Sequence, residues 1–244
     1  MNKKAADRRI TKFRLILILA ALLVVAVGAW AFSYRLFLRM GTSYKWGIDP
    51  NPGLGKVIYI LPIGVIDQGM LNDLKGFLSS DFRHPVEILP AERIPDLPYG
   101  REDQVKADLL RDWIKSRKGL PKDTFRLLAI TSEDIYAEGY NFIFGQADMG
   151  GLVSLISVYR INPVADGGSA INPGNPGNRN LYEERLIKLV RHELGHTFGL
   201  PHCQDNNCVM RFHESLDALD RGDDSYCSKC LDLINQRNPG LRQN

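Results

Sequence analysis

The 244-residue chain is long enough for one sizeable hydrophobic core, and its 44% hydrophobic and 24% charged residues are ordinary for a globular protein. The formal net charge of +3 is unevenly distributed. Residues 1–14 carry six basic side chains and one acidic side chain, whereas the remaining 230 residues carry 25 basic and 27 acidic ones. The main part of the chain is therefore not basic, which argues against nucleic acid as a partner.

A long apolar stretch follows the basic N-terminus. Residues 15–32 are eighteen consecutive residues without a charged or strongly polar side chain. As a helix they would span about 27 Å, close to the thickness of a bilayer's hydrocarbon core. More basic residues precede the stretch than follow it, which places the N-terminus in the cytoplasm. We predict a single-pass membrane protein with a basic cytoplasmic tail at residues 1–14, a transmembrane anchor at residues 15–34 and its folded domain outside the cytoplasm.

A cleaved signal peptide is the alternative interpretation of the same stretch. Ala29-Trp30-Ala31 fits the small-x-small pattern of a cleavage site, and cleavage would export the folded part without a tether. The length of the apolar run, and Arg35 and Arg39 behind it, favour the uncleaved anchor.

The folded domain is expected at residues 56–244, after a linker at residues 35–55 that is rich in glycine and proline. Apolar runs and helical spacings alternate along its first part. They predict a strand at 56–64, a helix around 70–78, a strand at 85–90, a helix marked by Val105, Leu109, Trp113 and Ile114, and a buried strand at 125–131. This alternation favours parallel strands joined by right-handed crossovers.

Two further strands, residues 141–148 and 152–161, are separated by only three residues. They are expected to pair closely with each other, so the predicted sheet is mixed. Residues 162–180 then form a long loop without an apolar period.

A helix follows this loop. Asn180 is its predicted N-cap, with Glu183 three residues later. The helix should end near Gly199, because glycine readily adopts the left-handed conformation that ends helices. Its predicted apolar face consists of Leu186, Leu189, Val190 and Leu194.

Three of the five histidines lie within residues 192–203, whose sequence is HELGHTFGLPHC. His192 and His196 are four residues apart, so on a helix both can reach one ion at about 2.0–2.1 Å. Gly199 lets the backbone reverse and bring His202 to the same ion. Three neutral imidazoles leave zinc one open position, as catalytic zinc sites do.

Glu193 adjoins the first histidine. We expect it to hold and deprotonate the water that the zinc activates, and later to pass the proton to the leaving amine of a peptide. With the three histidines and Gly199 it completes the H-E-x-x-H-x-x-G-x-x-H signature of metzincin peptidases. A bare H-E-x-x-H arises by chance, but the added glycine and histidine at fixed offsets make coincidence far rarer.

All four cysteines follow the third histidine. Cys227 and Cys230 form a C-x-x-C turn that can present two thiolates to one ion, and Cys203 and Cys208 can supply two more. Four thiolates make a closed tetrahedral site, so we predict a structural zinc ion there. Two disulfides are the alternative, since thiols outside the cytoplasm tend to oxidise.

The histidine motif, Cys208-Val209-Met210 and the final cysteine pair together resemble the archaemetzincins closely. The resemblance implies that Met210 occupies the methionine turn beneath the catalytic zinc, and that each chain binds two zinc ions, one catalytic and one structural. It also implies an α+β, zincin-like domain in which a mixed, mostly parallel sheet packs on helices. By the same analogy, residues 141–148 should line the cleft and pair with an extended peptide.

We therefore predict a zinc metallopeptidase of archaemetzincin type, a monomer that acts on peptides or proteins and meets the membrane through its N-terminal helix. A catalytically inactive, zinc-stabilised module that binds a partner is the alternative, although the intact Glu193 argues against it. A zinc ribbon with incidental histidines is a third interpretation. His213 is expected to be a solvated loop residue, with assistance at the cleft as the alternative. Tyr226 is expected to be a packing residue beside the cysteines, with a hydrogen bond to a transition-state oxyanion as the alternative.

Overall fold

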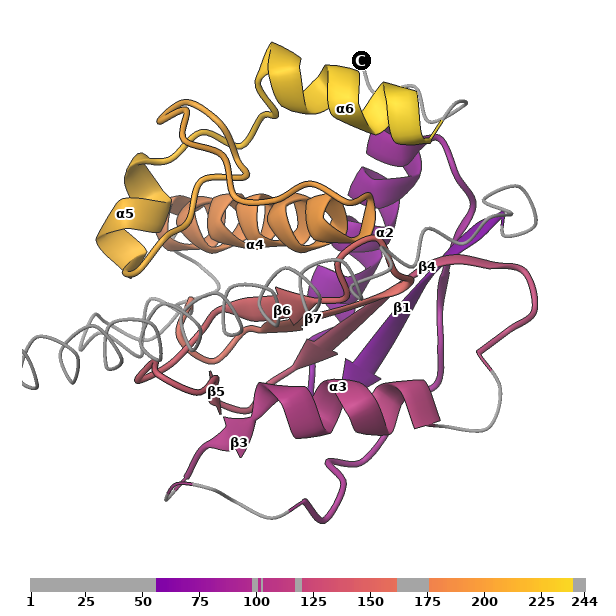
Figure 1. The fold of residues 1–244 in the computed structure, drawn as a ribbon. Coiled ribbons are helices and arrows are strands. Elements are labelled where there is room, and N and C mark those ends of the chain that lie inside the picture. The colour runs from indigo at the N-terminus through magenta and orange to yellow at the C-terminus, as the bar shows by residue number, and fades with distance from the viewer. Residues whose placement is uncertain (1–55, 98–100, 102, 117–119, 162–175, 239–244) are drawn as a thin grey trace, which may run out of the picture. The chain divides into compact units, whose positions relative to one another are not determined.

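A computed structural model describes residues 56–97, 101, 103–116, 120–161 and 176–238 (Figure 1). All of them lie in the second of the two units into which the chain divides, residues 46–244. The predicted tail, anchor and linker at residues 1–55 lie outside the described residues. Among the described helices, none is both long and apolar enough to cross a membrane.

Seven strands and five helices make up the described part of the chain. In order they are β1 (Val57–Ile63), α2 (Gln68–Phe82), β2 (Val86–Ile88), β3 (Val105–Lys106), α3 (Ala107–Ser116), β4 (Thr124–Thr131), β5 (Ile135–Tyr136), β6 (Gly145–Ala147), β7 (Val153–Ser157), α4 (Pro176–Thr197), α5 (Leu216–Arg221) and α6 (Ser228–Arg237).

The main sheet is mixed and mostly parallel, as predicted. Its strand order is β2-β1-β4-β7-β6, and β3 and β5 form a separate parallel pair. β1 runs parallel to β2 and β4, and β4 runs parallel to β7. Only a short turn separates β6 from β7, which excludes a crossover, so β6 runs antiparallel at the edge of the sheet.

Helices cover both faces of this sheet, with α3 on one side and α2 and α4 on the other (Figure 1). Alternate residues of β1 face the two layers: Ile58 and Ile60 pack in the cluster shared with α2 and α4, while Tyr59 and Leu61 pack in the cluster shared with α3. Every residue of β1 and β4 is buried, as expected for parallel strands covered on both faces.

The predicted helix that included Val105 and Leu109 is wrong at its start. Val105 lies in β3, where it pairs with Ile135, and α3 begins at Ala107. The buried residues of α3 are Ala107, Leu110 and Ile114, and Leu109 is only half-buried. The four-residue spacing of Val105 and Leu109 imitates a helix face, but strand pairing is what buries Val105.

The helix that carries His192 and His196 also starts earlier than predicted. α4 begins at Pro176, four residues before Asn180, so the end of the predicted loop is helical. Proline suits the first helical position, because its φ is already helical and its missing N–H would have no partner there. The predicted apolar face is confirmed, since Leu186, Leu189, Val190 and Leu194 are all buried.

Candidate active site

α4 ends in a turn that carries the chain back towards its own last residues. The N–H of Leu200 donates to the carbonyl of Gly195 (3.0 Å), and the N–H of Gly199 donates to the carbonyl of His196 (2.9 Å). Gly199 has a φ of 85°. The two bonds and the left-handed glycine form a Schellman motif, so the predicted helix end is confirmed. The turn brings His202 to the two helical histidines.

The three histidines have the geometry of metal ligands. The Nε2 atoms of His192 and His196 are 3.1 Å apart. One ring nitrogen from each of these two residues and from His202 lies within 4.8 Å of the others. Two nitrogens bound to one tetrahedral zinc at about 2.0–2.1 Å would be about 3.3–3.4 Å apart. The donor set therefore fits a single zinc ion.

Backbone carbonyls hold the other ring nitrogen of each helical histidine. His192 Nδ1 donates to the carbonyl of Val209 and His196 Nδ1 to that of Leu200, both at 2.7 Å. These bonds select the tautomer whose Nε2 lone pair is free for a metal. Burial lowers the pKa of His192, and it lowers the pKa of His196 to about 4. Both imidazoles are therefore neutral at neutral pH, which is the form that binds metal.

Glu193 lies beside these histidines, with its carboxylate against Gly145 of β6. The residue is only 4% exposed, and Oε2 has no hydrogen-bond partner in the described part of the chain. Burial raises the pKa of Glu193 to about 8, because desolvation disfavours the carboxylate. A carboxyl group with a pKa near neutrality is suited to accept and return a proton at neutral pH.

Met210 packs against α4, directly at Gly195. It is fully buried, and a side-chain methyl group on Gly195 would overlap its sulfur. The Met210 carbonyl accepts the N–H of Cys203 (2.8 Å), which ties this turn to the segment that carries the third histidine. Tyr226 packs against the same glycine, and its hydroxyl donates to the Arg191 carbonyl (2.5 Å), in agreement with a packing role.

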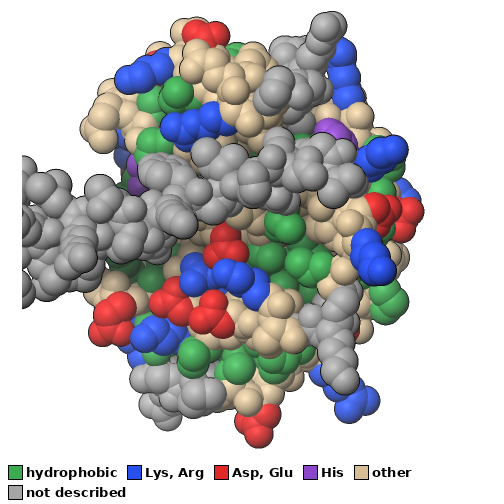
Figure 2. Space-filling view, turned by 45° about the vertical axis from the view of Figure 1, so that its right-hand side comes forward, with side chains coloured by type: hydrophobic (Ala, Val, Ile, Leu, Met, Phe, Trp, Pro, Cys, Tyr) green, Lys and Arg blue, Asp and Glu red, His purple; other side chains and the backbone are tan. Residues whose placement is uncertain are grey.

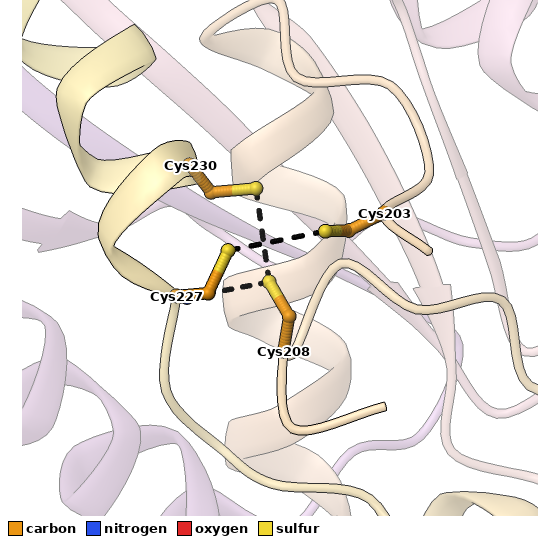
Figure 3. A group of neighbouring side chains, drawn as sticks. All are labelled: Cys203, Cys208, Cys227 and Cys230. Carbon is orange, nitrogen blue, oxygen red and sulfur yellow. Dashed lines mark hydrogen bonds between the residues drawn. The ribbon is translucent and has the colours of Figure 1, made fainter. Parts of the chain in front are cut away.

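The four cysteines form a second cluster, with their sulfurs pointing to a common centre (Figure 3). The Sγ atoms of Cys203 and Cys227 are 3.9 Å apart, and those of Cys208 and Cys230 are 3.7 Å apart. Four sulfurs around one zinc at about 2.3 Å would be about 3.8 Å apart. The cluster therefore fits a tetrahedral zinc ion.

The chemical state of the cysteines supports the same interpretation. All four are free thiols, so the disulfide alternative is not observed. Burial raises the pKa of the Cys208 and Cys230 thiols, so a bound cation is needed to hold both as thiolates at neutral pH.

A cleft of about 610 Å³ opens over the histidines. One wall is the segment that leads into β6, and residues 141–147 all line it. The predicted location of this segment in the cleft is confirmed, while its pairing with a peptide stays a prediction. Phe212, His213 and Glu214 also line the cleft. His213 is thus a half-buried wall residue rather than the solvated loop residue that we expected, because its ring packs against Gly222.

β6 presents backbone groups to the open edge of the sheet. The carbonyl of Phe144 accepts the N–H of Ser157 (2.8 Å), so residues 144 and 146 are the ones that bond to β7. Antiparallel pairing alternates, which turns the N–H and C=O of Gly145 and Ala147 away from β7. An extended peptide can add to this edge as a further strand.

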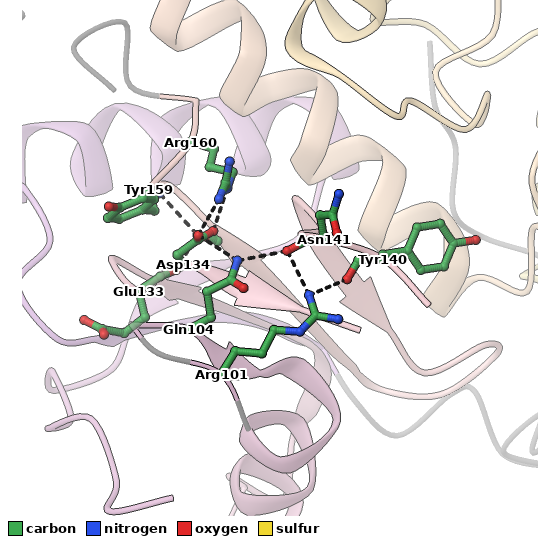
Figure 4. A network of polar contacts seen from close by, with 9 residues as sticks. Arg101, Gln104, Glu133, Asp134, Tyr140, Asn141, Tyr159 and Arg160 are labelled. Atoms are coloured by element: carbon green, nitrogen blue, oxygen red, sulfur yellow. Dashed lines mark hydrogen bonds and ion pairs between the residues drawn. The ribbon is translucent and has the colours of Figure 1, made fainter. Parts of the chain in front are cut away.

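A polar network behind the cleft holds the segment before β6 (Figure 4). Asp134 accepts two hydrogen bonds from Arg160 (2.7 and 2.6 Å) and one from Gln104 (2.8 Å). Gln104 also donates to the carbonyl of Asn141 (3.0 Å). The Arg160 guanidinium lies 4.2 Å from the ring centre of Phe142, which lines the cleft. The cleft wall is therefore fixed from behind by charged groups.

The turn between β6 and β7 is tied to both helical layers. The N–H of Gly150 donates to the carbonyl of His196 (2.8 Å). Asp148 in the same turn pairs with Arg111 (3.3 Å) and Lys115 (2.9 Å) of α3.

Figure 2 shows one face of the molecule, on which basic and acidic side chains are intermixed rather than gathered into a patch of one charge.

Comparison with known proteins decides the family. Residues 73–236 match peptidase family M54. The chain belongs to this family. The archaemetzincin of Archaeoglobus fulgidus is 43% identical over 179 residues, which are 72% of this chain and 98% of that protein. The archaemetzincin of Methanocaldococcus jannaschii is 35% identical over 181 residues, which are 74% of this chain and 93% of that protein.

The fold agrees with this assignment. The crystal structure of the archaemetzincin from Methanopyrus kandleri matches with a TM-score of 0.61 at 33% identity, covering 76% of this chain and 96% of that one. The archaemetzincin resemblance and the zincin-like fold predicted for the folded domain are thus confirmed. The protein is a zinc metallopeptidase of this family.

The H-E-x-x-H-x-x-G-x-x-H motif locates the candidate metal ligands but not the residues that surround them. Gly145, Gly195 and the Asp134 network were all missed by the sequence analysis. A glycine inside a strand often marks a close backbone approach, and this rule would have singled out Gly145. The network had no such signal, because Gln104 and Asp134 lie far from the motif and meet only in the fold.

Proposed function

We propose that this M54 peptidase hydrolyses peptide bonds with Glu193 as its general base. The catalytic zinc would be held by His192, His196 and His202. Zinc at such a site lowers the pKa of the water it binds and polarises the scissile carbonyl. Glu193 would take a proton from the attacking water and return it to the leaving amine. The observation that carries this proposal is that three imidazoles and a buried, unpartnered carboxyl oxygen, judged among the described residues, meet at one cleft.

We infer that a second zinc ion, held by the four cysteines, is structural. Four thiolates fill a tetrahedral site and leave no position for a substrate. The sulfur spacing of 3.7–3.9 Å supports a single shared ion. The two sites are joined through residues 208–210: Cys208 is a ligand, the Val209 carbonyl holds His192, and Met210 packs against α4.

We propose an extended peptide as the substrate. The outward-facing backbone groups of Gly145 and Ala147 would bond to its main chain, which makes binding tolerant of sequence. Gly145, Ala147 and Glu193 all line the cleft. A peptide bound in this way would have its scissile bond within reach of the proposed base.

Zinc content tests the two-site proposal. The purified wild-type protein is expected to contain two zinc ions per chain, and His196→Ala is expected to contain one. His84→Ala is the matched control, since His84 stacks on Phe125 outside the cluster and should keep both ions. Elemental analysis by mass spectrometry measures the ratio. One zinc in all three proteins would leave only the cysteine site and would indicate a zinc-stabilised binding module instead of a peptidase.

We further propose that the folded domain acts outside the cytoplasm, tethered by residues 15–34. The apolar length of that segment and the basic residues before it support this topology. Membrane fractionation with an antibody to the folded domain should find the protein in the membrane pellet, accessible to added protease from the outer side. A mature N-terminus close to residue 32 would show cleavage and export instead.

A further inference from the structure

Gly145 of β6 lies in direct contact with the side chain of Glu193. A Cβ atom on Gly145 would be 2.6 Å from Oε1, 2.7 Å from Cγ and 2.8 Å from Cδ of Glu193. These separations are far below the spacing of about 3.5–4.0 Å that non-bonded carbon atoms prefer. No side chain larger than hydrogen fits at residue 145 while Glu193 keeps its place.

The backbone of Gly145 does not itself require glycine. Among the described residues, the glycines with positive φ are Gly64, Gly139, Gly150 and Gly199, and Gly145 is not one of them. Gly145 pairs with Ile156 in a regular antiparallel register. Other residues can adopt this strand conformation, so the reason for a glycine is space beside Glu193 rather than conformational freedom.

A methyl group at residue 145 would move the carboxylate and leave the fold in place. The three nearest atoms that it would meet all belong to the flexible side chain of Glu193. The helix that carries Glu193 is anchored independently, because Leu189, Val190 and Leu194 are buried in the core beneath the sheet. Oε2 has no hydrogen-bond partner within the described ranges that would resist the displacement.

We propose that Gly145 is a positioning residue for Glu193. Contact with the edge strand β6 sets how far the Glu193 carboxylate extends over the histidines. Gly145 also turns its backbone N–H and C=O to the open edge of the sheet. Because β6 would then contact both the bound peptide and Glu193, it would fix the distance between the peptide and the carboxylate. This proposal rests on the proposed role of Glu193 as the base.

The first test is Gly145→Ala. We expect kcat to fall on the order of 10- to 100-fold, because small misplacements of a catalytic group have effects of that size. The zinc content and the thermal unfolding temperature should stay as in the wild type. Gly76→Ala is the control, since a Cβ added at Gly76 meets nothing within 4 Å. Wild-type kcat in Gly145→Ala, or a loss of zinc or of thermal stability, would overturn the proposal.

The second test is a rescue by Glu193→Asp. The shorter side chain alone should lower kcat, because the carboxylate retracts. In the Gly145→Ala background the shorter side chain clears the added methyl group. We therefore expect the double variant to be about tenfold more active than the product of the two single effects. Effects that simply multiply would show that the two residues act independently and would reject a positioning role.

Binding of acetohydroxamic acid gives a readout that does not depend on turnover. This small zinc ligand carries a hydroxyl that donates to a neighbouring carboxylate. Its affinity, measured by calorimetry, should therefore follow the same order as kcat across the wild type, Gly145→Ala, Glu193→Asp and the double variant. Glu193→Ala separates the two proposals. If that variant keeps wild-type kcat, Glu193 is not the base and the proposed function fails, whatever Gly145→Ala does.

Discussion

Glu193→Gln is expected to lower kcat by a factor of about 10²–10⁴ while both zinc ions remain bound. The amide has almost the shape of the carboxylate but cannot accept a proton. The proposed metal ligands and their backbone partners are untouched, since the Val209 and Leu200 carbonyls hold the two helical histidines. Peptide hydrolysis, monitored by mass spectrometry of the products, and zinc analysis of the same sample measure the two quantities.

The free energy of unfolding should also depend differently on pH in Glu193→Gln and in the wild type. In protein freed of its catalytic zinc, burial raises the pKa of Glu193 to about 8, well above its value in the unfolded chain. At this group the folded state then binds more protons than the unfolded state between about pH 4.5 and pH 8. The contribution of Glu193 to the free energy of unfolding therefore falls as the pH rises through this window. Glu193→Gln has no such group and should lack this fall.

Urea unfolding at several pH values, after removal of the catalytic zinc with a chelator, tests this. Glu184→Gln is a suitable control, because it removes an exposed carboxylate from the same helix. An equal pH dependence in the wild type and in Glu193→Gln would contradict the burial argument. Unchanged kcat in Glu193→Gln would contradict the assignment of the base.

The parts of the fold that local sequence patterns encode were the ones predicted correctly. β1 is an apolar run, and β4 is a mostly apolar run that Arg126 interrupts. Burial on both faces favours strands of this composition. The histidines, Glu193 and Gly199 were found because four residues make one helical turn and a left-handed glycine ends it. Each of these features depends on neighbours in the sequence.

The features that were missed depend on contacts between distant segments. Val105 was assigned to a helix because its partner Ile135 is thirty residues away. Gly145 and Glu193 touch only because β6 is placed at the sheet edge over α4. His213 lines the cleft with its ring against Gly222, the residue that follows α5, and no local sequence pattern indicates this contact. Tertiary packing, not local preference, decides such positions.

Cys208→Ala is expected to remove both zinc ions, although only one of them has a cysteine ligand. Cys208 is fully buried, and the next two residues support the catalytic site: the Val209 carbonyl holds His192, and Met210 packs against α4. Structural zinc sites contribute about 10–16 kcal/mol of binding free energy, which is comparable to the total stability of a domain, about 5–15 kcal/mol. Loss of this ion should therefore release residues 203–238.

Loss of the structural zinc should also affect the C-terminal end of α4. α6 carries Cys230 and the buried Ile234, and Arg237 at its end donates to the carbonyl of Gly199 in the turn that places His202. When the cysteine site is empty, this support is lost. Zinc content should thus fall below one per chain in Cys208→Ala, whereas His196→Ala should lose one ion only, and limited proteolysis should cut the C-terminal segment.

Met210→Leu is the matched control for the cysteine variant, because a swap of similar volume at a neighbouring buried position costs about 1.5 kcal/mol or less. It should keep both ions and resist proteolysis. If Cys208→Ala also kept its catalytic zinc and an intact C-terminal segment, the two sites would be energetically independent. Cys208→Ala is thus expected to lose both ions and His196→Ala only one. This difference would show that the structural site stabilises the catalytic site, through residues 208–210 and α6, and that the catalytic site does not stabilise the structural one.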